Sequence, residues 1–595
     1  MPDALPPLGA TVRPDGVAFR VWAPKAVRVA LALEGDEHPM QPEGSDVYAA
    51  FVPDARAGAR YGFRLDDGSG ALGPVFPDPH SRAQPDGVHG LSEAVDPAFA
   101  WTDGAWAGVP QRDLVFYELH VGTFTPEGTL DAAAERLPYL RELGITAVEL
   151  MPCHAFPGHF GWGYDPAAFF APHAAYGRPD SLRRFVDRAH ALGLAVFHDT
   201  VLNHLGPDGA YVNAYAPMLT ARHPTPWGLA VNLDDVGREG SRRFFREASL
   251  VWLDEYHMDG LRLDATSALI DDSPVHFLAE LSEHVAALPA RVGGPRRVLV
   301  AEDLHNRTVV TRPRSEGGYG IDAQWVDDLH FQVQNLSGGA QPYYGDYAGA
   351  TAHEIARTLQ QNWAFTGASV RKQDALAADD PAGTPPHAAV LYLDDHDLTG
   401  NRPHGDRLNA RLEPALFRAL SAMWLFAPQL PLVWMGQEWA ASTPFPFFAD
   451  HHDGLAPLVR AGRRHEHDTW FTYEGEPPDP VSLAAFHTAR LDWSELERAP
   501  HAGTLALYRH LLALRPALAS TFAVDAHGPH ALTLRRGDLV LVVALRADEA
   551  VPCPTGTLEW TTEDAAFAHD PRPPVVANGV ATFPAPAAIL VRTGA

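Results

Sequence analysis

Short apolar runs recur through the middle of the 595-residue chain, and each is followed by a loop and a longer stretch with helical spacing of apolar residues. Short runs bounded by turn residues predict buried strands, whereas the longer amphipathic stretches predict helices. The runs predicted as strands are 114–120, 145–151, 194–199, 260–264, 298–302, 322–333, 388–394 and 430–434. Strands that alternate with helices in this way favour a (β/α)8 TIM barrel over an open sheet.

Capping residues mark the ends of several predicted helices. The stretch 130–143 is predicted as one helix, with Thr129 as its N-cap and Gly144 at its C-cap. A second helix is predicted over 182–192, just before Gly193. The remaining predicted helices of this region span 242–256, 277–288 and 505–518.

The two ends of the chain follow a different pattern. Residues 1–100 alternate apolar and polar positions between turn signals, which predicts an N-terminal β-sandwich. Glycine and proline between 101 and 111 indicate a linker. The catalytic barrel is then expected over 113–518, and a second β-sandwich over 519–595.

Composition narrows the function classes. The formal net charge of -28 disfavours nucleic-acid binding, which needs an excess of basic residues. Two cysteines give no disulfide framework, and no motif indicates a metal or a cofactor, so we expect none. The chain shows neither a signal-peptide pattern nor an apolar run long enough for a membrane span, which predicts a cytoplasmic protein without a membrane partner.

Three acids stand at or just past the ends of predicted strands: Asp264, Glu302 and Asp397. In a barrel the carboxyl ends of the strands meet at one face, which is where active sites of this fold lie. A pair of carboxyl groups with a third acid is what the cleavage of a glycosidic bond requires. The pattern therefore predicts a sugar-cleaving site.

Alternation along the fourth strand predicts the state of its acid. In Leu261-Arg262-Leu263-Asp264 the two charged side chains share one face, and burial against the helices would be costly, so both should point into the barrel. Arg262 would keep Asp264 ionised, as a nucleophile must be, although a purely structural ion pair is the alternative. Glu302, in an apolar setting near other acids, should have a raised pKa and serve as the proton donor.

Further polar and aromatic residues follow the neighbouring strands. Asp199 can brace Arg262, and His204 and His396 can contact the sugar. Trp162 or Tyr164 can stack on a pyranose face, with buried packing as the equal alternative.

These segments together resemble the α-amylase superfamily of glycoside hydrolases. The resemblance rests on 199–204, 260–265, Glu302 and 396–397, in this order. It implies a retaining mechanism with Asp264 as nucleophile, Glu302 as acid/base and Asp397 as transition-state stabiliser. It also implies that the sugar subsite at the cleavage point is lined by Arg262, His204, His396 and Tyr164. The other substrate-binding candidates are Asp199, Asn203 and Trp162.

Within this superfamily the chain is most similar to the maltooligosyltrehalose trehalohydrolase family, through the segments 78–89, 117–129, 436–445 and 459–466. The resemblance implies hydrolysis of the α-1,4 bond next to a terminal trehalose unit, with maltooligosyl trehalose and related α-1,4-glucans as ligands. Trehalose recognition is expected from the loops around Trp227, Trp439 and 445–448. Asp395 and Gln437 depart from the Asn and Glu usual in the family, and Asp395 is expected to change the local charge.

Three alternatives stay open. A glycogen branching enzyme shares the module, the barrel and the acids, and a plain α-amylase or debranching enzyme comes next. A non-catalytic glucan-binding barrel is a different class, which the presence of all three acids disfavours.

Overall fold

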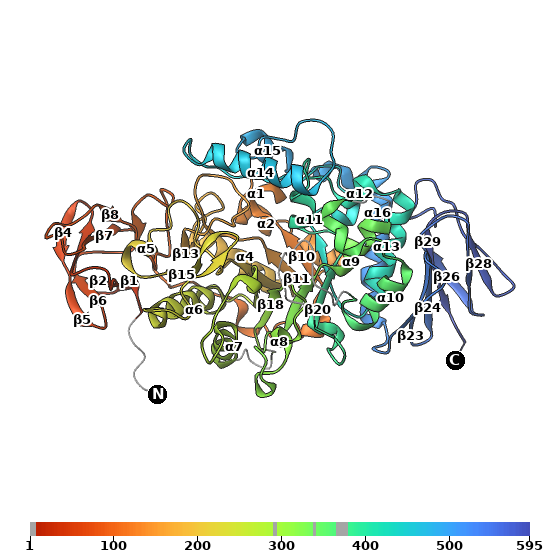
Figure 1. Ribbon diagram of the computed structural model, residues 1–595, viewed down its shortest axis with the longest axis horizontal. Coiled ribbons are helices and arrows are strands. Elements are labelled where there is room, and N and C mark those ends of the chain that lie inside the picture. Colours follow the sequence, from red (N-terminus) through yellow and green to blue (C-terminus); the bar gives the residue numbers. More distant parts are fainter. Residues whose placement is uncertain (1–6, 290–293, 295, 337–340, 365–378, 595) are drawn as a thin grey trace.

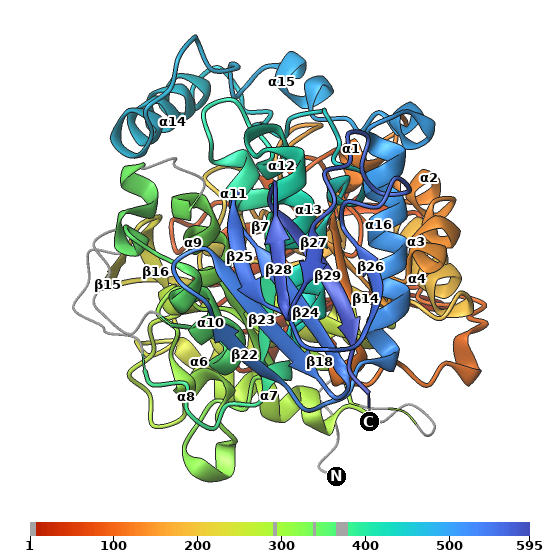
Figure 2. The ribbon, with the colours of Figure 1, turned by 90° about the vertical axis from the view of Figure 1, so that its right-hand side faces the viewer.

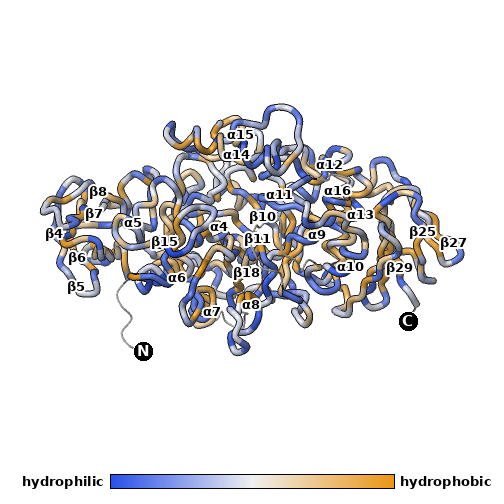
Figure 3. The backbone as a smooth tube through the Cα atoms, in the orientation of Figure 1, coloured by the Kyte–Doolittle hydropathy of each residue, from blue (hydrophilic) through white to orange (hydrophobic). Residues whose placement is uncertain are grey.

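A computed structural model describes residues 7–289, 294, 296–336, 341–364 and 379–594. Three regions follow one another along the long axis of the molecule, with the N-terminal sheets at one end, a barrel in the middle and the C-terminal sheets at the other end (Figure 1). Hydrophobic stretches recur in all three regions (Figure 3). Across the described residues, none of the helices combines the length and the apolarity that a bilayer crossing would need.

The N-terminal region consists of two antiparallel sheets. Their strands bury alternate side chains, such as Val17, Phe19 and Val21 on β2, against a common core. One sheet has the order β1 (Gly9–Arg13), β2 (Gly16–Trp22), β6 (Val47–Val52), β5 (Gln41–Gly44). The other has the order β4 (Asp36–Pro39), β3 (Arg28–Leu33), β7 (Arg60–Asp66), β8 (Val75–Phe76), with β9 (Ser92–Glu93) paired to β7.

The central region is a closed barrel of eight parallel strands, which confirms the predicted fold class. Leu261 and Leu263 pack outward in the main core, and Phe197 and Val300 fill the inside of the barrel. In order around the barrel the strands are β10 (Phe116–Leu119), β11 (Ala147–Leu150), β14 (Ala195–Thr200), β17 (Gly260–Leu263), β18 (Val298–Glu302), β19 (Ala323–Val326), β20 (Ala389–Tyr392) and β21 (Leu430–Trp434).

The sixth predicted strand is too long. Strand β19 ends at Val326, and residues from Asp328 form helix α9 (Asp328–Leu336). The sequence after 328 alternates apolar and polar residues, but the polar ones are also buried and are hydrogen-bonded by their surroundings. Gln332, for example, donates to Thr358 over 2.9 Å. Tertiary partners therefore stabilise a buried helix whose pattern alone indicates a strand.

The helix predicted over 130–143 is broken into α2 (Leu130–Ala134) and α3 (Leu137–Leu143). Pro138 lacks a backbone N–H, and its ring would collide with the carbonyl four residues earlier, so the helix restarts there. Thr129 caps α2 by accepting from the Ala132 N–H, and Gly144 ends α3 with a φ of 105°, both as predicted.

The other long helices lie around the barrel or close to it. They are α4 (Pro179–Ala191), α6 (Arg238–Asp254), α7 (Phe277–Ala287), α10 (Ala352–Gln361), α13 (Pro414–Phe426) and α16 (His501–Leu514). After β21 the chain forms α14 (Ala456–Trp470) and α15 (Leu483–Thr488), which stand together at the top of the molecule, away from the C-terminal sheets (Figure 2).

The C-terminal region is a pair of antiparallel sheets. One has the order β22 (Ala523–Ala526), β23 (Ala531–Arg536), β24 (Leu539–Ala544), β29 (Ala587–Arg592), β26 (Thr557–Thr561). The other has the order β25 (Glu549–Pro552), β28 (Val580–Phe583), β27 (Val575–Ala577). A buried ion pair between Arg418 of α13 and Glu563 ties this region to the barrel helices. The sheets fall within the three predicted ranges, whose boundaries at 100, 113 and 519 stay a prediction.

Candidate active site

The three acids gather at the carboxyl ends of the barrel strands. Asp264 directly follows β17, Glu302 is the last residue of β18, and Asp397 lies in the short helix α11 (His396–Gly400) that follows β20. All three line one cleft of about 560 Å³, together with Trp162, Tyr164 and His204. The fold therefore brings residues more than 130 positions apart into one site, as parallel strand ends must.

Arg262 is the centre of this site and is fully buried. Its Nη1 donates to both carboxylate oxygens of Asp199 and to Oδ1 of Asp264, each over 2.8 Å, and its Nη2 donates to Oε2 of Glu302 over 2.9 Å. Arg262 and Asp264 both point into the barrel, and Asp199 braces Arg262, as predicted for all three residues. The guanidinium places a positive charge directly beside the Asp264 carboxylate.

Glu302 has the electrostatic setting of a proton donor. Burial raises the pKa of its carboxyl, Arg262 opposes this, and the negative charges of Asp264 and Asp397 add to the rise, so that the pKa reaches about 8. A carboxylic acid with this pKa holds its proton at neutral pH, which is the state in which it can protonate a leaving oxygen.

The pH dependence follows from this pKa. Since only protonated Glu302 can donate, kcat/KM on maltotriosyl trehalose is expected to be lost as pH rises through about 8. The measurement is a pH–rate profile at low substrate concentration. A basic limb centred about two pH units lower would contradict the assignment.

A hydrogen-bonded group of Tyr164, Asp199 and His396 forms the floor beside Arg262. The Tyr164 hydroxyl donates to Asp199 Oδ2 over 2.6 Å and lies 2.7 Å from His396 Nε2. The rings of Tyr164 and His396 are stacked, with centroids 5.1 Å apart. Trp162 also lines the cleft, but it is 96% buried and stacks on Phe445, which leaves Tyr164 the better placed of the two to contact a sugar.

Asn203 positions the nucleophile candidate Asp264, and His204 forms part of the cleft wall. Asn203 Nδ2 donates to Asp264 Oδ2 over 2.7 Å and to the Asp264 carbonyl over 2.9 Å. His204 bonds to Asn203 through Nδ1 and lies 2.8 Å from the Tyr164 carbonyl through Nε2. Both ring nitrogens of His204 are thus engaged by the protein, so His204 offers the cleft its ring rather than a donor.

Two inward acids, Glu118 and Glu149, were missed by the sequence analysis. They stand side by side on β10 and β11, on the face that points into the barrel. Glu118 pairs with His396 at 2.5 Å; burial lowers the pKa of His396, but Glu118 and Asp397 outweigh it and raise that pKa to about 10. Glu149 is buried with no hydrogen-bond partner for either carboxyl oxygen, and burial next to Glu118 and Asp199 raises its pKa well above the ordinary value.

The same substitution should destabilise the protein to different extents at the two acids. Glu118→Gln removes the partner of a buried charged imidazole and is expected to cost about 3–5 kcal/mol of unfolding free energy. Glu149→Gln replaces a carboxyl group whose oxygens have no hydrogen-bond partner and is expected to cost less than about 2 kcal/mol. Because the folded-state pKa of His396 is raised from 6.5 to about 10, the Glu118 contribution should be full below pH 6.5 and lost as pH rises through about 10.

Urea unfolding of both variants at low and high pH measures this contrast. Equal destabilisation by the two substitutions would contradict the assigned charge states. The alternation rule that placed Arg262 inward would have found both acids, since each occupies an inward position of a predicted strand.

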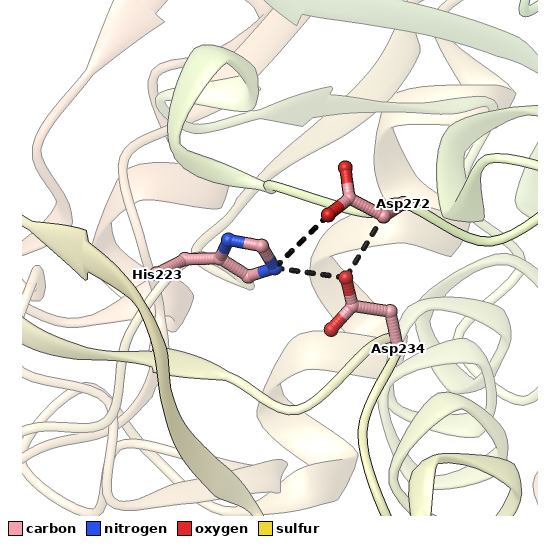
Figure 4. A group of neighbouring side chains, drawn as sticks. All are labelled: His223, Asp234 and Asp272. Carbon is pink, nitrogen blue, oxygen red and sulfur yellow. Dashed lines mark hydrogen bonds and ion pairs between the residues drawn. The ribbon is translucent and has the colours of Figure 1, made fainter.

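One group of described residues has the composition of a metal site. His223, Asp234 and Asp272 bring three ligand atoms within 4.8 Å of one another (Figure 4). His223 Nε2 lies 2.8 Å from Asp234 and 3.9 Å from Asp272, and Arg222 lies 3.4 and 3.5 Å from the same two carboxylates. Since Arg222 already supplies the positive charge, we interpret this group as an ion-pair network that ties the hairpin of β15 (Leu219–Thr225) and β16 (Gly228–Val231) to the segment after β17.

Known proteins match the chain in both of its first two regions. The family model of carbohydrate-binding module 48, the isoamylase N-terminal domain, matches residues 7–81, and that of the alpha amylase catalytic domain matches residues 74–218. A malto-oligosyltrehalose trehalohydrolase from Deinococcus radiodurans is 43% identical over 516 residues, which cover 85% of this chain and 82% of that protein. One from Arthrobacter ramosus is 41% identical and covers 91% of this chain and 94% of that protein.

The chain belongs to the malto-oligosyltrehalose trehalohydrolase family.

A solved structure matches the chain over its full length. A Salmonella typhimurium protein described as an alpha amylase has a crystal structure that matches with a TM-score of 0.88 and 35% identity, covering 99% of each chain. This match includes all three regions of the fold, also the C-terminal sheets beyond the part that the family models match.

The two departures from the trehalohydrolase pattern do not touch the three acids. Gln437 donates to the Tyr508 hydroxyl over 2.9 Å and accepts from the Trp434 backbone, behind the strand ends. Asp395 caps α11 by accepting from the Leu398 N–H. Burial raises the pKa of Asp395 well above its ordinary value, with Glu118 and Asp397 adding to the rise. The expected effect of Asp395 on the local charge stays a prediction.

The other acids near the site have structural contacts. Asp303 pairs with Arg307 and is not among the residues that line the cleft. Of the residues suggested for trehalose recognition, Trp227 and Phe447 line the cleft. Trp439 is fully buried, and its indole donates to Glu495, which makes it a core residue.

Proposed function

We propose that this protein is a retaining glycoside hydrolase that cleaves the α-1,4-glucosidic bond next to the terminal trehalose of maltooligosyl trehalose and releases trehalose. The observation that carries the chemistry is that Asp264 and Glu302 share one buried guanidinium, through adjacent nitrogens of Arg262, at the mouth of the cleft. Membership of the trehalohydrolase family supports the substrate, because the relatives named above carry that activity in their names.

The first step of the proposed mechanism breaks the glycosidic bond. The Asp264 carboxylate attacks the anomeric carbon while Glu302 gives its proton to the departing trehalose oxygen, which leaves a covalent glucosyl ester on Asp264. Contacts with Arg262 and Asn203 hold both carboxylate oxygens of Asp264 in place, so the attacking oxygen is positioned before substrate binds.

The second step returns the enzyme to its starting state. The Glu302 carboxylate removes a proton from water, and the resulting hydroxide displaces Asp264 from the anomeric carbon with net retention. Retaining enzymes hold the two carboxyl groups about 5–5.5 Å apart. The shared contact with one guanidinium supports a close pair, and the spacing itself stays a prediction.

Asp397 and Tyr164 complete the subsite of the reacting sugar. Asp397 lines the same cleft as the nucleophile, and its side chain is 38% exposed, so its carboxylate can bind ring hydroxyls and favour the positive charge that develops on the ring. The Tyr164 face, held in place by Asp199 and His396, is the surface on which that ring would stack.

We also propose an α-1,4-glucan ligand and a cytoplasmic location. An α-1,4-glucan ligand is supported by the match to carbohydrate-binding module 48 as well as by the cleft. A cytoplasmic location fits the unpaired state of both cysteines, Cys153 and Cys553, since oxidising compartments favour disulfides.

A product assay tests the proposal and separates its alternatives. The protein is incubated with maltotriosyl trehalose and, separately, with maltopentaose and amylose, and the sugars released are identified. Free trehalose from the first, with little cleavage of the others, is the expected result. Maltose and glucose from plain glucans would indicate an α-amylase, new α-1,6 branches without net hydrolysis would indicate a branching enzyme, and binding without turnover would indicate a glucan-binding barrel.

A further inference from the structure

A side wall of the cleft comes from a helix that the mechanism does not use. Helix α14 follows β21 and contributes Arg463 and Glu466 to the cleft lining. This helix contains the 459–466 segment, which carries part of the resemblance to the trehalohydrolase family. Nothing in the two-step chemistry accounts for an ion pair at this place.

A continuous line of contacts joins α14 to the third acid. Asn401 Nδ2 donates to Asp397 Oδ1 over 3.0 Å, and Arg463 Nη1 donates to Asn401 Oδ1 over 2.9 Å. Arg463 Nη1 also donates to Glu466 Oε2 over 2.7 Å. The line therefore runs from the subsite of the reacting sugar outward along one wall, with a polar side chain at each step.

The Arg463 side chain is fixed for contact with a ligand. Its guanidinium lies over the Phe447 ring at 4.7 Å from the centroid, its side chain is only 14% exposed, and its Nε is buried without a hydrogen-bond partner. Glu466 is 53% exposed and opens to the cleft. An aromatic face beside a carboxylate and a guanidinium suits the apolar face and the hydroxyls of a pyranose.

The position of this wall relative to the leaving group determines which sugar unit it can contact. Glu302 must stand beside the leaving oxygen, so the departing trehalose extends past the residues that follow the nucleophile and the acid, such as Ser267 and His305 on the loops after β17 and β18. Asn401 and Arg463 come after β20 and β21, on the far side of Asp397. The glucan chain that is retained on the enzyme must leave the reacting sugar in that direction.

We propose that Arg463 and Glu466 bind the second glucose unit of the retained glucan chain, next to the reacting sugar, and thereby determine how strongly the enzyme prefers longer substrates. This inference rests on the proposed function and adds to it a residue pair that sets chain-length preference. Both residues bind substrate remote from the cleaved bond, so they act on affinity and on the positioning of the chain.

A chain-length series tests the proposal. Glucosyl trehalose places one sugar on the retained side, and maltosyl trehalose places two. Glu466→Gln and Arg463→Gln are each expected to lower kcat/KM on maltosyl trehalose by about 10- to 100-fold and to change it on glucosyl trehalose by less than about 3-fold. The matched control is Arg464→Gln, on the same helix, because Arg464 is 58% exposed and pairs with Glu476 instead of lining the cleft.

The possible outcomes distinguish failure of the Arg463–Glu466 subsite from failure of the proposed function. If Glu466→Gln lowers kcat/KM equally on both substrates, or lowers it on neither, the proposal is overturned. Glu466→Gln is the deciding variant because Arg463 contacts Asn401, so that Arg463→Gln can also disturb Asp397, whereas Glu466 does not contact Asn401. If the parent releases no trehalose from any substrate, the proposed function fails separately. Calorimetry with maltotriose then still decides the subsite, since Glu466→Gln in a Glu302→Gln background should weaken its binding about 10-fold, and unchanged affinity would overturn it.

Discussion

Replacement of Asp264 by asparagine is expected to lower kcat by about 10⁴- to 10⁶-fold, which is the range for removing a member of a catalytic unit. The amide is nearly the same shape as the carboxylate, so the fold should be retained, but a neutral amide cannot attack the anomeric carbon. The change also leaves the buried Arg262 with one negative partner fewer, although Asp199 still holds it through two contacts.

Initial rates on maltotriosyl trehalose measure this effect, with circular dichroism and the unfolding midpoint as checks on folding. The control is Asp272→Asn, because Asp272 lies in the segment after the same strand and its side chain is 64% exposed. That variant should hydrolyse at the parent rate. A Asp264→Asn protein that folds normally and keeps more than about 1% of parent kcat would rule out the nucleophile role.

Replacement of Glu302 by glutamine should also lower kcat strongly, but unlike the Asp264 replacement its effect should depend on the leaving group. General acid catalysis contributes typically about 10²- to 10⁴-fold, so kcat on maltotriosyl trehalose should fall by this amount. An aryl maltoside with an acidic phenol needs no proton to leave, so its glycosylation step should be much less impaired. Substrate affinity should be nearly unchanged because the amide keeps the shape of the acid.

The pH profile of this variant is the more specific readout. Because the basic limb near pH 8 is assigned to Glu302, it should disappear when no proton can be lost there. A basic limb that persists unchanged in Glu302→Gln would assign it to another group, and equal loss on both leaving groups would remove Glu302 from the proton-transfer role.

Much of the fold was predictable because the barrel strands and their acids are local signals. Each strand is a short apolar run, and Asp264, Glu302 and Asp397 follow such runs directly, so their common face comes from the topology of parallel strands alone. The pairing of Arg262 with Asp264 and Asp199 was predictable from period-two alternation, which needs no tertiary information.

The remaining features depend on contacts between distant segments. Residues 328–333 read as a strand because apolar and polar positions alternate, and only partners such as Thr358 make a helix with buried polar residues stable there. The role of Arg463 depends on Asn401, 62 positions earlier, and no local pattern shows that α14 reaches the cleft. His204 was expected to contact the sugar; it lines the cleft, and its contacts with Asn203 and Tyr164, which engage both ring nitrogens, could not be read from the sequence.

The most direct test of the central claim is to follow the hydrolysis of maltotriosyl trehalose by proton NMR from the first minutes. The account predicts free trehalose together with maltotriose whose new reducing end appears first as the α-anomer and only later equilibrates, since two displacements at the anomeric carbon retain its configuration. Initial β-maltotriose would contradict the covalent role of Asp264, and cleavage without any trehalose signal would contradict the assigned substrate.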